Sequence, residues 1–220
     1  MNTKVYLLKL DFLKDPQVYE EMRAYASLGR RLRAEKYRLT EDRIRSLGAG
    51  LLLQAAIGLS DEDMACEPNG KPYFQERPEL AFSLSHSGML AVLAVSERRC
   101  GVDCEEIRTE KESFRFIAQK YFTEEEQQEV FGGADEGEHE EFDAAAFTRI
   151  WTKKEAYVKM TGDGLSGLKE FGRKPCHFPE VQAPEGYAEN LCLVGEEPEE
   201  VTVQSVTPEE LAEALRLKQK

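Results

Sequence analysis

Residues 147–165 read FTRIWTKKEAYVKMTGDGL, and this stretch predicts one helix that ends at a glycine. Its apolar residues Phe147, Ile150 and Val158 recur at steps that keep them on one face of a helix. Gly162 follows the last periodic residue and can take the left-handed backbone conformation that ends a helix. The stretch therefore predicts an amphipathic helix whose apolar face packs on the rest of the fold.

Charged side chains of this helix lie on the same flank as the only tryptophan of the chain. Glu155 follows Trp151 by four residues and Lys159 follows Glu155 by four, so the three side chains share one side of the helix. An acid and a base beside a tryptophan indicate a half-buried cleft. The alternative is a solvated Glu–Lys pair, which stabilises a helix by only a few tenths of a kcal/mol.

The net charge of −13 argues against generic binding to nucleic acids or to anionic membranes. The charge is uneven along the chain, because residues 1–60 hold 11 Lys and Arg against 7 Asp and Glu, whereas the remainder holds 18 against 35. An acidic chain with a basic first quarter indicates an anion-binding site in that quarter. The alternative is a solvated basic face.

The cysteines and the first residues indicate a reducing compartment. The five cysteines are scattered, and none has the CxxC or Cys/His spacing of a zinc site or a redox pair. The first ten residues lack the apolar core and the cleavage site of a signal peptide, and no run approaches the ~20 apolar residues of a membrane span. We therefore expect a cytoplasmic protein.

Turn residues and apolar periodicity divide the chain into alternating groups of strands and helices. The expected elements are a strand at 3–10, helices at 16–38 and 40–59, strands at 81–88, 90–95 and 101–105, helices at 123–130 and 147–160, antiparallel strands within 168–206 and a helix from 207. Thr40 is the expected N-cap of the second helix, and residues 97–100 are the expected hairpin turn. The acidic, glycine-rich residues 132–145 are expected to form a mobile loop. This order predicts an α+β fold of two similar halves that meet near residue 100.

Two carboxylates leave the same face of one predicted strand. Asp103 and Glu105 are two residues apart, about 7 Å along a strand, while Val102 and Cys104 point to the other face. Such carboxylates repel each other unless a cation lies between them, and ligation by oxygen alone favours Mg²⁺. Glu155 is the natural third carboxylate if its helix packs over this strand. The alternative is an edge strand with a polar face.

A histidine lies in a segment rich in hydroxyl groups. His86 stands between Ser85 and Ser87, and Lys71 precedes it in an Asn-Gly-Lys-Pro turn. Imidazole, hydroxyl and ammonium groups bind phosphates, although a single histidine is often satisfied within the fold. The chain has no Gly-x-Ser-x-Gly elbow, no Walker loop and no GxGxxG motif.

Four motifs together carry a resemblance to a known family. They are NGKP at 69–72, FSLSHS at 82–87, GVDCE at 101–105 and WTKKEAYVK at 151–159. In their order and spacing they resemble the motifs of the 4′-phosphopantetheinyl transferases. The length of 220 residues is similar to that of the surfactin-synthetase-activating (Sfp) type.

The resemblance implies an enzyme that transfers the phosphopantetheine arm of coenzyme A to a serine of an apo carrier protein and releases adenosine 3′,5′-bisphosphate. It implies that Mg²⁺ or Mn²⁺ is held by Asp103, Glu105 and Glu155. Glu155 would position or deprotonate the serine, and Lys159 would meet the leaving phosphate. The implied catalytic residues are Asp103, Glu155, Lys159 and His86. The residues implied for coenzyme A binding are Arg30, Arg33, Arg45, Ser46, Lys71, Ser85, His86 and Lys159.

The resemblance also implies a monomer of two α+β halves related by a pseudo-twofold axis, each a small antiparallel sheet packed with helices. Residues 1–100 would bind the phosphates and adenine of coenzyme A, residues 101–220 would hold the metal and catalytic groups, and the active site would lie between them. The expected clients are acyl or peptidyl carrier proteins of fatty-acid, polyketide or peptide synthesis. We expect carrier contact near residues 110–131. The alternatives are a module that binds coenzyme A or a nucleotide without turnover, and an interaction protein with solvated charges.

Overall fold

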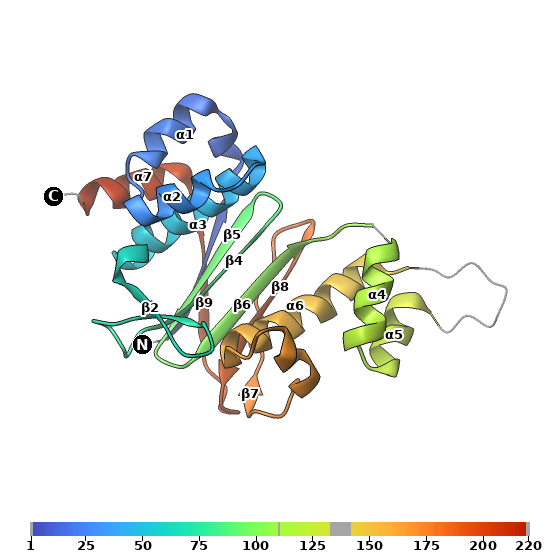
Figure 1. Ribbon diagram of the computed structural model, residues 1–220. Helices are drawn as coiled ribbons and strands as arrows, with labels where there is room; N and C mark the ends of the chain where they lie inside the picture. Colours follow the sequence, from blue (N-terminus) through green and yellow to red (C-terminus); the bar gives the residue numbers. More distant parts are fainter. Residues whose placement is uncertain (1, 110, 133–141, 219–220) are drawn as a thin grey trace.

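The computed structural model describes residues 2–109, 111–132 and 142–218, which form two β-sheets with helices on their outer sides (Figure 1). The first sheet has the order β4-β5-β1-β9, with β1 Thr3–Lys9, β4 Ala81–Ser87, β5 Leu90–Ser96 and β9 Val201–Val206. The second has the order β6-β8-β7, with β6 Cys100–Glu106, β7 Cys176–His177 and β8 Tyr187–Val194. A separate hairpin pairs β2 Met64–Cys66 with β3 Pro72–Phe74. The predicted α+β fold is confirmed.

Four helices cover the outer side of the first sheet. They are α1 Pro16–Arg23, α2 Leu28–Glu35, α3 Thr40–Ile57 and α7 Pro208–Leu217. The single helix predicted at 16–38 is wrong, because Ser27 caps a new helix by accepting a hydrogen bond from the Arg30 backbone N–H at 3.2 Å. Leu39, and not Thr40, precedes the first residue of α3, and its side chain makes no cap.

The two sheets pack against each other through an apolar layer. Strand β5 is buried along its whole length: Leu90, Val92 and Ala94 face this layer, and the alternate residues face α3. Val102 and Cys104 of β6 contribute to the same layer from the second sheet. A strand buried on both faces explains the uninterrupted apolar run of β5.

The hairpin predicted at residues 97–100 is wrong, because β5 and β6 belong to different sheets. Both edges of β5 are already hydrogen-bonded, one to β4 and the other to β1. The chain therefore leaves the first sheet after Ser96, and β6 pairs with β8 instead.

Helix α6 (Ala144–Thr161) covers the outer face of β6 and β8. It approaches β6 so closely that a Cβ atom on Gly101 would lie 2.0 Å from the Ala156 carbonyl oxygen. Glycine is therefore required at residue 101. The predicted stop is confirmed, since Gly162 has a φ of 80° and donates its N–H to the Val158 carbonyl.

Two short helices, α4 (Lys111–Tyr121) and α5 (Glu124–Phe131), pack on α6 through an aromatic cluster. Phe114 and Phe122 both stack on Phe147 of α6. Most of the acidic loop predicted at 132–145 lies outside the described residues, and α6 already begins within its last residues.

The C-terminal part of the chain returns to the first sheet. Strand β9 pairs with β1 in parallel, which makes that sheet mixed and corrects the purely antiparallel arrangement expected for 168–206. Helix α7 then packs against α3. The division into halves at 1–100 and 101–220 stays a prediction. In the structure, β9 and α7 lie after residue 100 in sequence but pack with the first sheet and its helices.

The remaining elements are short 3-10 helices. They are η1 Asp11–Lys14, η2 Asp61–Asp63 and η3 Gly164–Glu170. Among the described residues, no helix has both the length and the apolar character needed to cross a membrane.

Candidate active site

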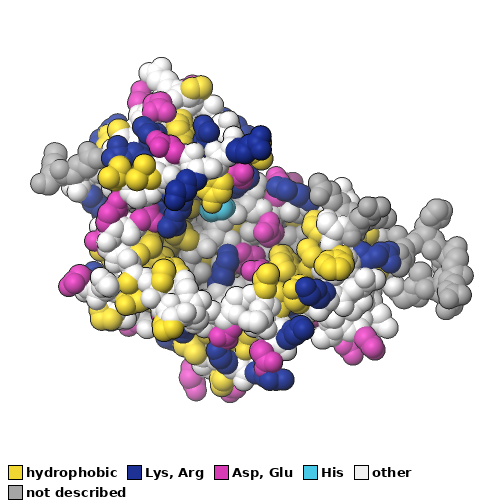
Figure 2. Space-filling view, in the orientation of Figure 1, with side chains coloured by type: hydrophobic (Ala, Val, Ile, Leu, Met, Phe, Trp, Pro, Cys, Tyr) yellow, Lys and Arg dark blue, Asp and Glu magenta, His cyan; other side chains and the backbone are white. Residues whose placement is uncertain are grey.

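A hollow of about 1000 Å³ opens where β4, β6 and α6 meet. Figure 2 shows it near the centre of one face, with basic and acidic side chains gathered around it. The predicted site residues that line it are Arg30, Arg33, Lys71, Ser85, His86, Asp103, Glu105, Glu155 and Lys159. Segments far apart in sequence therefore bring most of the predicted residues together.

Asp103 lies at the base of the hollow and is only 4% exposed. Its Oδ1 atom accepts hydrogen bonds from Ser85 Oγ at 2.7 Å and from Lys159 Nζ at 2.6 Å. The ammonium group of Lys159 also donates to Ser85 Oγ at 2.9 Å. Asp103 Oδ2 is buried and has no hydrogen-bond partner among the described residues. One oxygen of this carboxylate is thus held in place and the other is left for a ligand.

Glu105 and Glu155 face the same hollow from a strand and a helix. Burial raises the pKa of both carboxyl groups, and the negative charge of Asp103 adds to each rise. Lys159 opposes this, because its positive charge lies among the three carboxylates. Burial alone would lower the pKa of Lys159, but the contact with Asp103 raises it, so the side chain stays charged at neutral pH.

His86 projects from β4 at the hollow and is exposed. Partial desolvation, with the positive charges of Lys159 and Arg45, holds the pKa of His86 below its usual range. The imidazole is therefore neutral at neutral pH and can both donate and accept a hydrogen bond.

Arg30 and Arg33 form a basic wall on α2. The Arg30 guanidinium is buried and donates to both oxygens of Asp61, at 2.7 and 2.9 Å. A Cβ atom on Gly50 would lie 2.3 Å from Arg30 Nε, so the helix behind it needs glycine there. Arg33 has a side chain 57% exposed, and its Nη1 lies 3.6 Å from Asp61 Oδ1. Arg33 is thus the more accessible cation of the wall.

Comparisons with known proteins point to one family. Residues 99–214 match the model of a family described as the 4′-phosphopantetheinyl transferase superfamily. The chain is 30% identical over 198 residues to the 4′-phosphopantetheinyl transferase psf-1 of Bacillus pumilus, which covers 82% of each chain. It is 25% identical to the 4′-phosphopantetheinyl transferase Sfp of Bacillus subtilis strain 168, over 92% of this chain and 97% of that one. The 4′-phosphopantetheinyl transferase HetI of Nostoc is 30% identical over 77% of this chain and 73% of its own.

The chain belongs to the 4′-phosphopantetheinyl transferase superfamily. The matched region includes β6 and α6, the two elements that carry the carboxylates and Lys159. The resemblance inferred from the four motifs is confirmed.

The donor set of this transferase-family site fits a divalent cation. Asp103, Glu105 and Glu155 supply only oxygen, which is the preference of Mg²⁺, and Asp103 Oδ2 is a buried acceptor without a partner. Within the ranges that the structure describes, no three His, Cys, Asp or Glu side chains converge closely enough to count as a metal cluster. The identity of the metal ligands stays a prediction.

Lys71 lines the hollow, but its ammonium group is hydrogen-bonded to the backbone of two other elements. Its ammonium group donates to the carbonyl oxygens of Cys100 at 2.9 Å and Lys159 at 2.6 Å, which ties the Asn-Gly-Lys-Pro turn to β6 and to α6. Burial lowers the pKa of Lys71. Its predicted contact with a phosphate stays a prediction, and in this structure the lysine joins the two elements of the site.

Arg45 and Ser46 do not line the hollow. Arg45 donates to the Gly88 carbonyl at 3.2 Å and pairs with Asp42, and Ser46 is buried in α3. The backbone carbonyl of Ser46 accepts a hydrogen bond from Arg30 at 3.2 Å. Their predicted roles in coenzyme A binding remain predictions.

Sequence reasoning did not single out three residues that support the site. Asp61 neutralises Arg30, and no sequence pattern points to that pairing. Ser83 and Ser87 contact β6 from β4, and the alternation of serine with other residues at 83–87 was the available signal.

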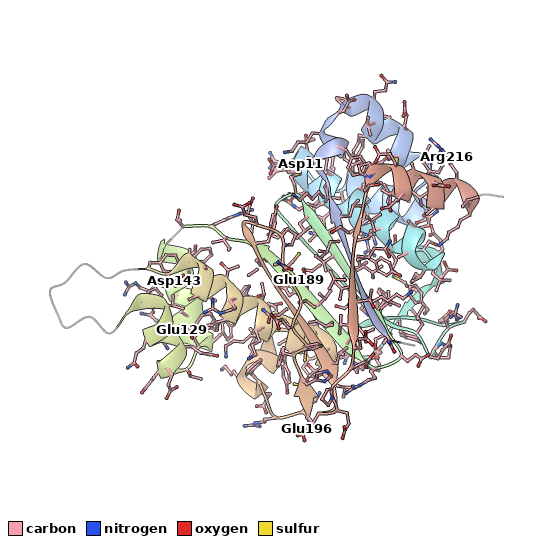
Figure 3. The ribbon with its side chains drawn as sticks, turned by 180° about the vertical axis from the view of Figure 1, so that it is seen from behind. Asp11, Glu129, Asp143, Glu189, Glu196 and Arg216 are labelled. Atoms are coloured by element: carbon pink, nitrogen blue, oxygen red, sulfur yellow. The ribbon has the colours of Figure 1, made fainter. Side chains whose placement is uncertain are left out.

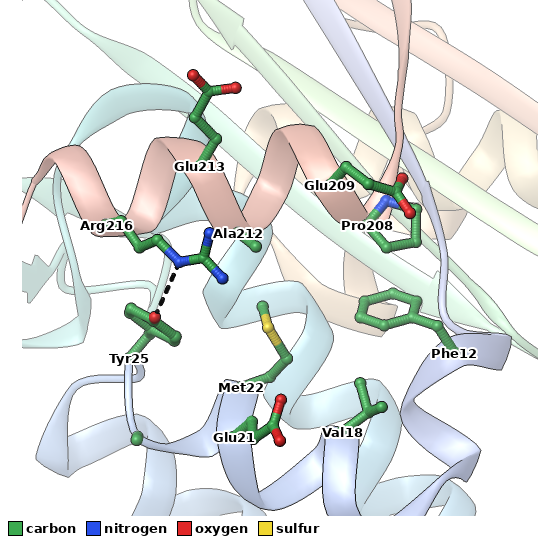
Figure 4. A pocket seen from close by; sticks show the side chains of 11 residues that line it. Phe12, Val18, Glu21, Met22, Tyr25, Pro208, Glu209, Ala212, Glu213 and Arg216 are labelled. Atoms are coloured by element: carbon green, nitrogen blue, oxygen red, sulfur yellow. Dashed lines mark hydrogen bonds between the residues drawn. The ribbon is translucent and has the colours of Figure 1, made fainter.

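A second hollow, of about 980 Å³, lies between α1 and α7 (Figure 4). Its lining includes the apolar side chains of Phe12 and Met22 and the acidic side chain of Glu213. The Arg216 guanidinium is turned to the Tyr25 hydroxyl at 3.3 Å. Size therefore does not distinguish the two hollows, whereas the first is lined by three carboxylates and by an ammonium group that contacts one of them.

Proposed function

We propose that this chain transfers the 4′-phosphopantetheine arm of coenzyme A to a serine of an apo carrier protein. The observation that carries the proposal is a single hollow lined by three carboxylates, from β6 and α6, and by the ammonium group of Lys159, which contacts one of them. Family membership supports the reaction class, because the family and the relatives described above are named 4′-phosphopantetheinyl transferases.

The reaction forms one bond and breaks one. The serine oxygen attacks the β-phosphorus of coenzyme A, and the bond from that phosphorus to the bridging oxygen breaks to release adenosine 3′,5′-bisphosphate. Glu155 takes the serine proton, directly or through a water, and its raised pKa brings it closer to a working base at neutral pH. Lys159 stabilises the negative charge that develops on the leaving phosphate.

Asp103, Glu105 and Glu155 would hold Mg²⁺, or Mn²⁺. When bound, the cation supplies charge neutralisation at the pyrophosphate oxygens. Lys159 contacts Asp103, and its ammonium group would be available to a phosphate oxygen.

The basic wall on α2 would bind the rest of coenzyme A. The Arg33 side chain is accessible and suits a charge-assisted contact with a phosphate. Arg30 is already bound to Asp61, so it would hold the wall in shape and add positive charge behind Arg33. His86 and Ser85 would meet the pyrophosphate or the 3′-phosphate from β4.

The decisive experiment is mass spectrometry of an apo carrier protein incubated with this protein, coenzyme A and Mg²⁺. We expect the carrier to gain the mass of one phosphopantetheine arm, and we expect no gain when its acceptor serine is replaced by alanine. An unchanged carrier mass with each of an acyl and a peptidyl carrier, together with saturable coenzyme A binding, would favour the alternative of a binding module without turnover.

The client class, the monomeric state, the cytoplasmic location and the lack of nucleic-acid or membrane partners stay predictions. Carrier contact near residues 110–131 also stays a prediction. Phe116 of α4, which lies in this region, is 67% exposed. The described cysteines are all free, which is typical of a reducing compartment.

A further inference from the structure

Serine side chains form hydrogen bonds across the junction between the two sheets, where β4 and β6 have no backbone pairing among the described residues. Strands β4 and β6 lie side by side, yet among the described residues β4 pairs only with β5 in its sheet and β6 only with β8 in the other. Three serines of β4, at 83, 85 and 87, reach across this junction to β6. We call these three residues the serine seam.

Each residue of the serine seam has a different partner. Ser83 Oγ accepts from the Val102 backbone N–H at 3.0 Å. Ser85 Oγ donates to Asp103, as described above. Ser87 Oγ donates to Glu105 Oε2 at 2.5 Å and accepts from the Glu106 backbone N–H at 3.2 Å.

The two contacts of Ser87 fix the direction of its hydroxyl group. A hydroxyl has one hydrogen, and the N–H of Glu106 occupies a lone pair, so the hydrogen is free to point at Glu105. Ser87 is 7% exposed, and its bond to a carboxylate inside the fold is a strong, charge-assisted one. Glu105 Oε2 is thereby anchored to the first sheet, while the side chain still lines the hollow.

We propose that Ser87 is a positioning residue that orients the Glu105 carboxylate and thereby sets the affinity of the hollow for a divalent cation. The inference rests on the proposed function, which gives Glu105 to the metal. Groups that orient a metal ligand from behind change metal affinity by about 10- to 100-fold when they are removed. The first sheet, which holds no carboxylate ligand itself, would thus control the geometry of the ligands on the second.

The chain offers a matched control in Ser83. Ser83 is 6% exposed and belongs to the same strand and the same seam. It accepts a hydrogen bond from a backbone N–H of β6 and, unlike Ser87, does not contact a carboxylate there. Ser83→Ala and Ser87→Ala therefore both remove a serine bridge, and only the second releases a carboxylate. Ser87→Thr keeps the hydroxyl group and serves as the rescue variant.

The experiment titrates Mg²⁺ calorimetrically into the wild-type protein and the three variants, each mixed with coenzyme A. We expect the Kd for Mg²⁺ to rise at least about 10-fold in Ser87→Ala and to stay within about threefold of wild type in Ser83→Ala and Ser87→Thr. The Tm should fall by similar amounts in the two alanine variants. In the transfer assay, Ser87→Ala should need more Mg²⁺ for half-maximal rate, with kcat at saturating Mg²⁺ close to that of wild type.

Equal changes of the Mg²⁺ Kd in Ser83→Ala and Ser87→Ala would overturn the positioning role and leave only a bridge between sheets. Absence of Mg²⁺ binding by the wild-type protein would overturn both the metal assignment and this role. A negative mass-spectrometric transfer assay with the expected Kd pattern would instead overturn the proposed function and keep the role of Ser87. If Ser87→Ala does not fold, a Ser87→Thr protein whose Kd rises as far as 10-fold would overturn the proposal.

Discussion

The two faces of the strand pair β6–β8 differ in whether their carboxyl groups have hydrogen-bond partners. On the face under α6, Asp103 has Ser85 and Lys159 as partners, and Glu105 has Ser87. On the opposite face, toward the first sheet, Glu189 of β8 is 7% exposed and neither of its carboxylate oxygens has a hydrogen-bond partner among the described residues. Figure 3, a view from behind, labels Glu189 among the strands.

This difference separates a candidate reactive site from a buried, uncharged carboxyl group. Burial raises the pKa of Glu189 to about 8, so this carboxyl group is largely protonated and uncharged at neutral pH. Asp103 and Glu105 are also enclosed, but hydroxyl and ammonium groups hold them beside an open hollow. A perturbed carboxyl group is therefore a useful sign of function only where partners and access accompany it.

The largest expected effect comes from a carboxylate of the hollow. Glu155→Gln should lower the rate of transfer by a factor of 100 or more, because the amide can neither accept the serine proton nor neutralise a cation. The measurement is the initial rate of phosphopantetheine transfer at saturating coenzyme A and Mg²⁺.

Glu189→Gln is the control on the other face of the sheet. It removes a carboxyl group with the larger perturbation of pKa, yet its transfer rate should stay within about twofold of wild type. A rate loss in Glu189→Gln as large as that of Glu155→Gln would contradict the distinction between the two faces.

Local rules predicted the elements of the candidate site well. The alternation of a strand placed Asp103 and Glu105 on one face, and the helical repeat placed Glu155 and Lys159 on one flank; both arrangements occur in the structure. The stop at Gly162 depends only on its own backbone conformation. These features involve neighbours within a few residues, which is why periodicity and turn chemistry were sufficient.

Features that depend on distant partners were not predictable in this way. The parallel pairing of β9 with β1 joins residues about two hundred positions apart, and no local pattern specifies it. The pairing of Arg30 with Asp61 and the use of Lys71 by backbone carbonyls also arise from tertiary contact. The NGKP motif predicts that Lys71 binds a phosphate. In the structure its ammonium group donates to two backbone carbonyl oxygens.

A second test removes a partner from the face under α6. Lys159→Met should lower the free energy of unfolding by about 2 kcal/mol at pH 7, because the buried Asp103 carboxylate loses its opposite charge. The value lies below that of a fully buried pair, since the Lys159 side chain is 30% exposed. Equilibrium unfolding in urea measures it.

The matched control is Lys174→Met, which breaks the exposed pair between Lys174 and Asp163. Both side chains of that pair reach solvent, so its loss should cost less than about 0.5 kcal/mol. Equal losses in the two variants would show that Asp103 is not held by Lys159 in the way the contacts indicate.

The last expected effect concerns the pH dependence of stability on the opposite face. The folded protein keeps the proton of Glu189 up to about pH 8, whereas the unfolded chain loses it near the ordinary glutamate value of about 4.5. Between these values the native state binds more protons than the unfolded state, so the contribution of Glu189 to stability is complete below about pH 4.5 and declines as the pH rises to 8.

We therefore expect the free energy of unfolding to fall with pH between 5 and 8 by at most about 1.4 kcal/mol per unit from this group. The same measurements on Glu189→Gln should show a flatter profile, because glutamine does not titrate. Other groups titrate in both proteins, so the quantity to compare is the difference between the two profiles. Its neighbour across the strand pair, Cys104, has a thiol pKa raised by burial and does not ionise in this range. Parallel profiles would mean that Glu189 reaches solvent or a hydrogen-bond partner in solution. The two faces would then differ only in whether their carboxyl groups line the hollow.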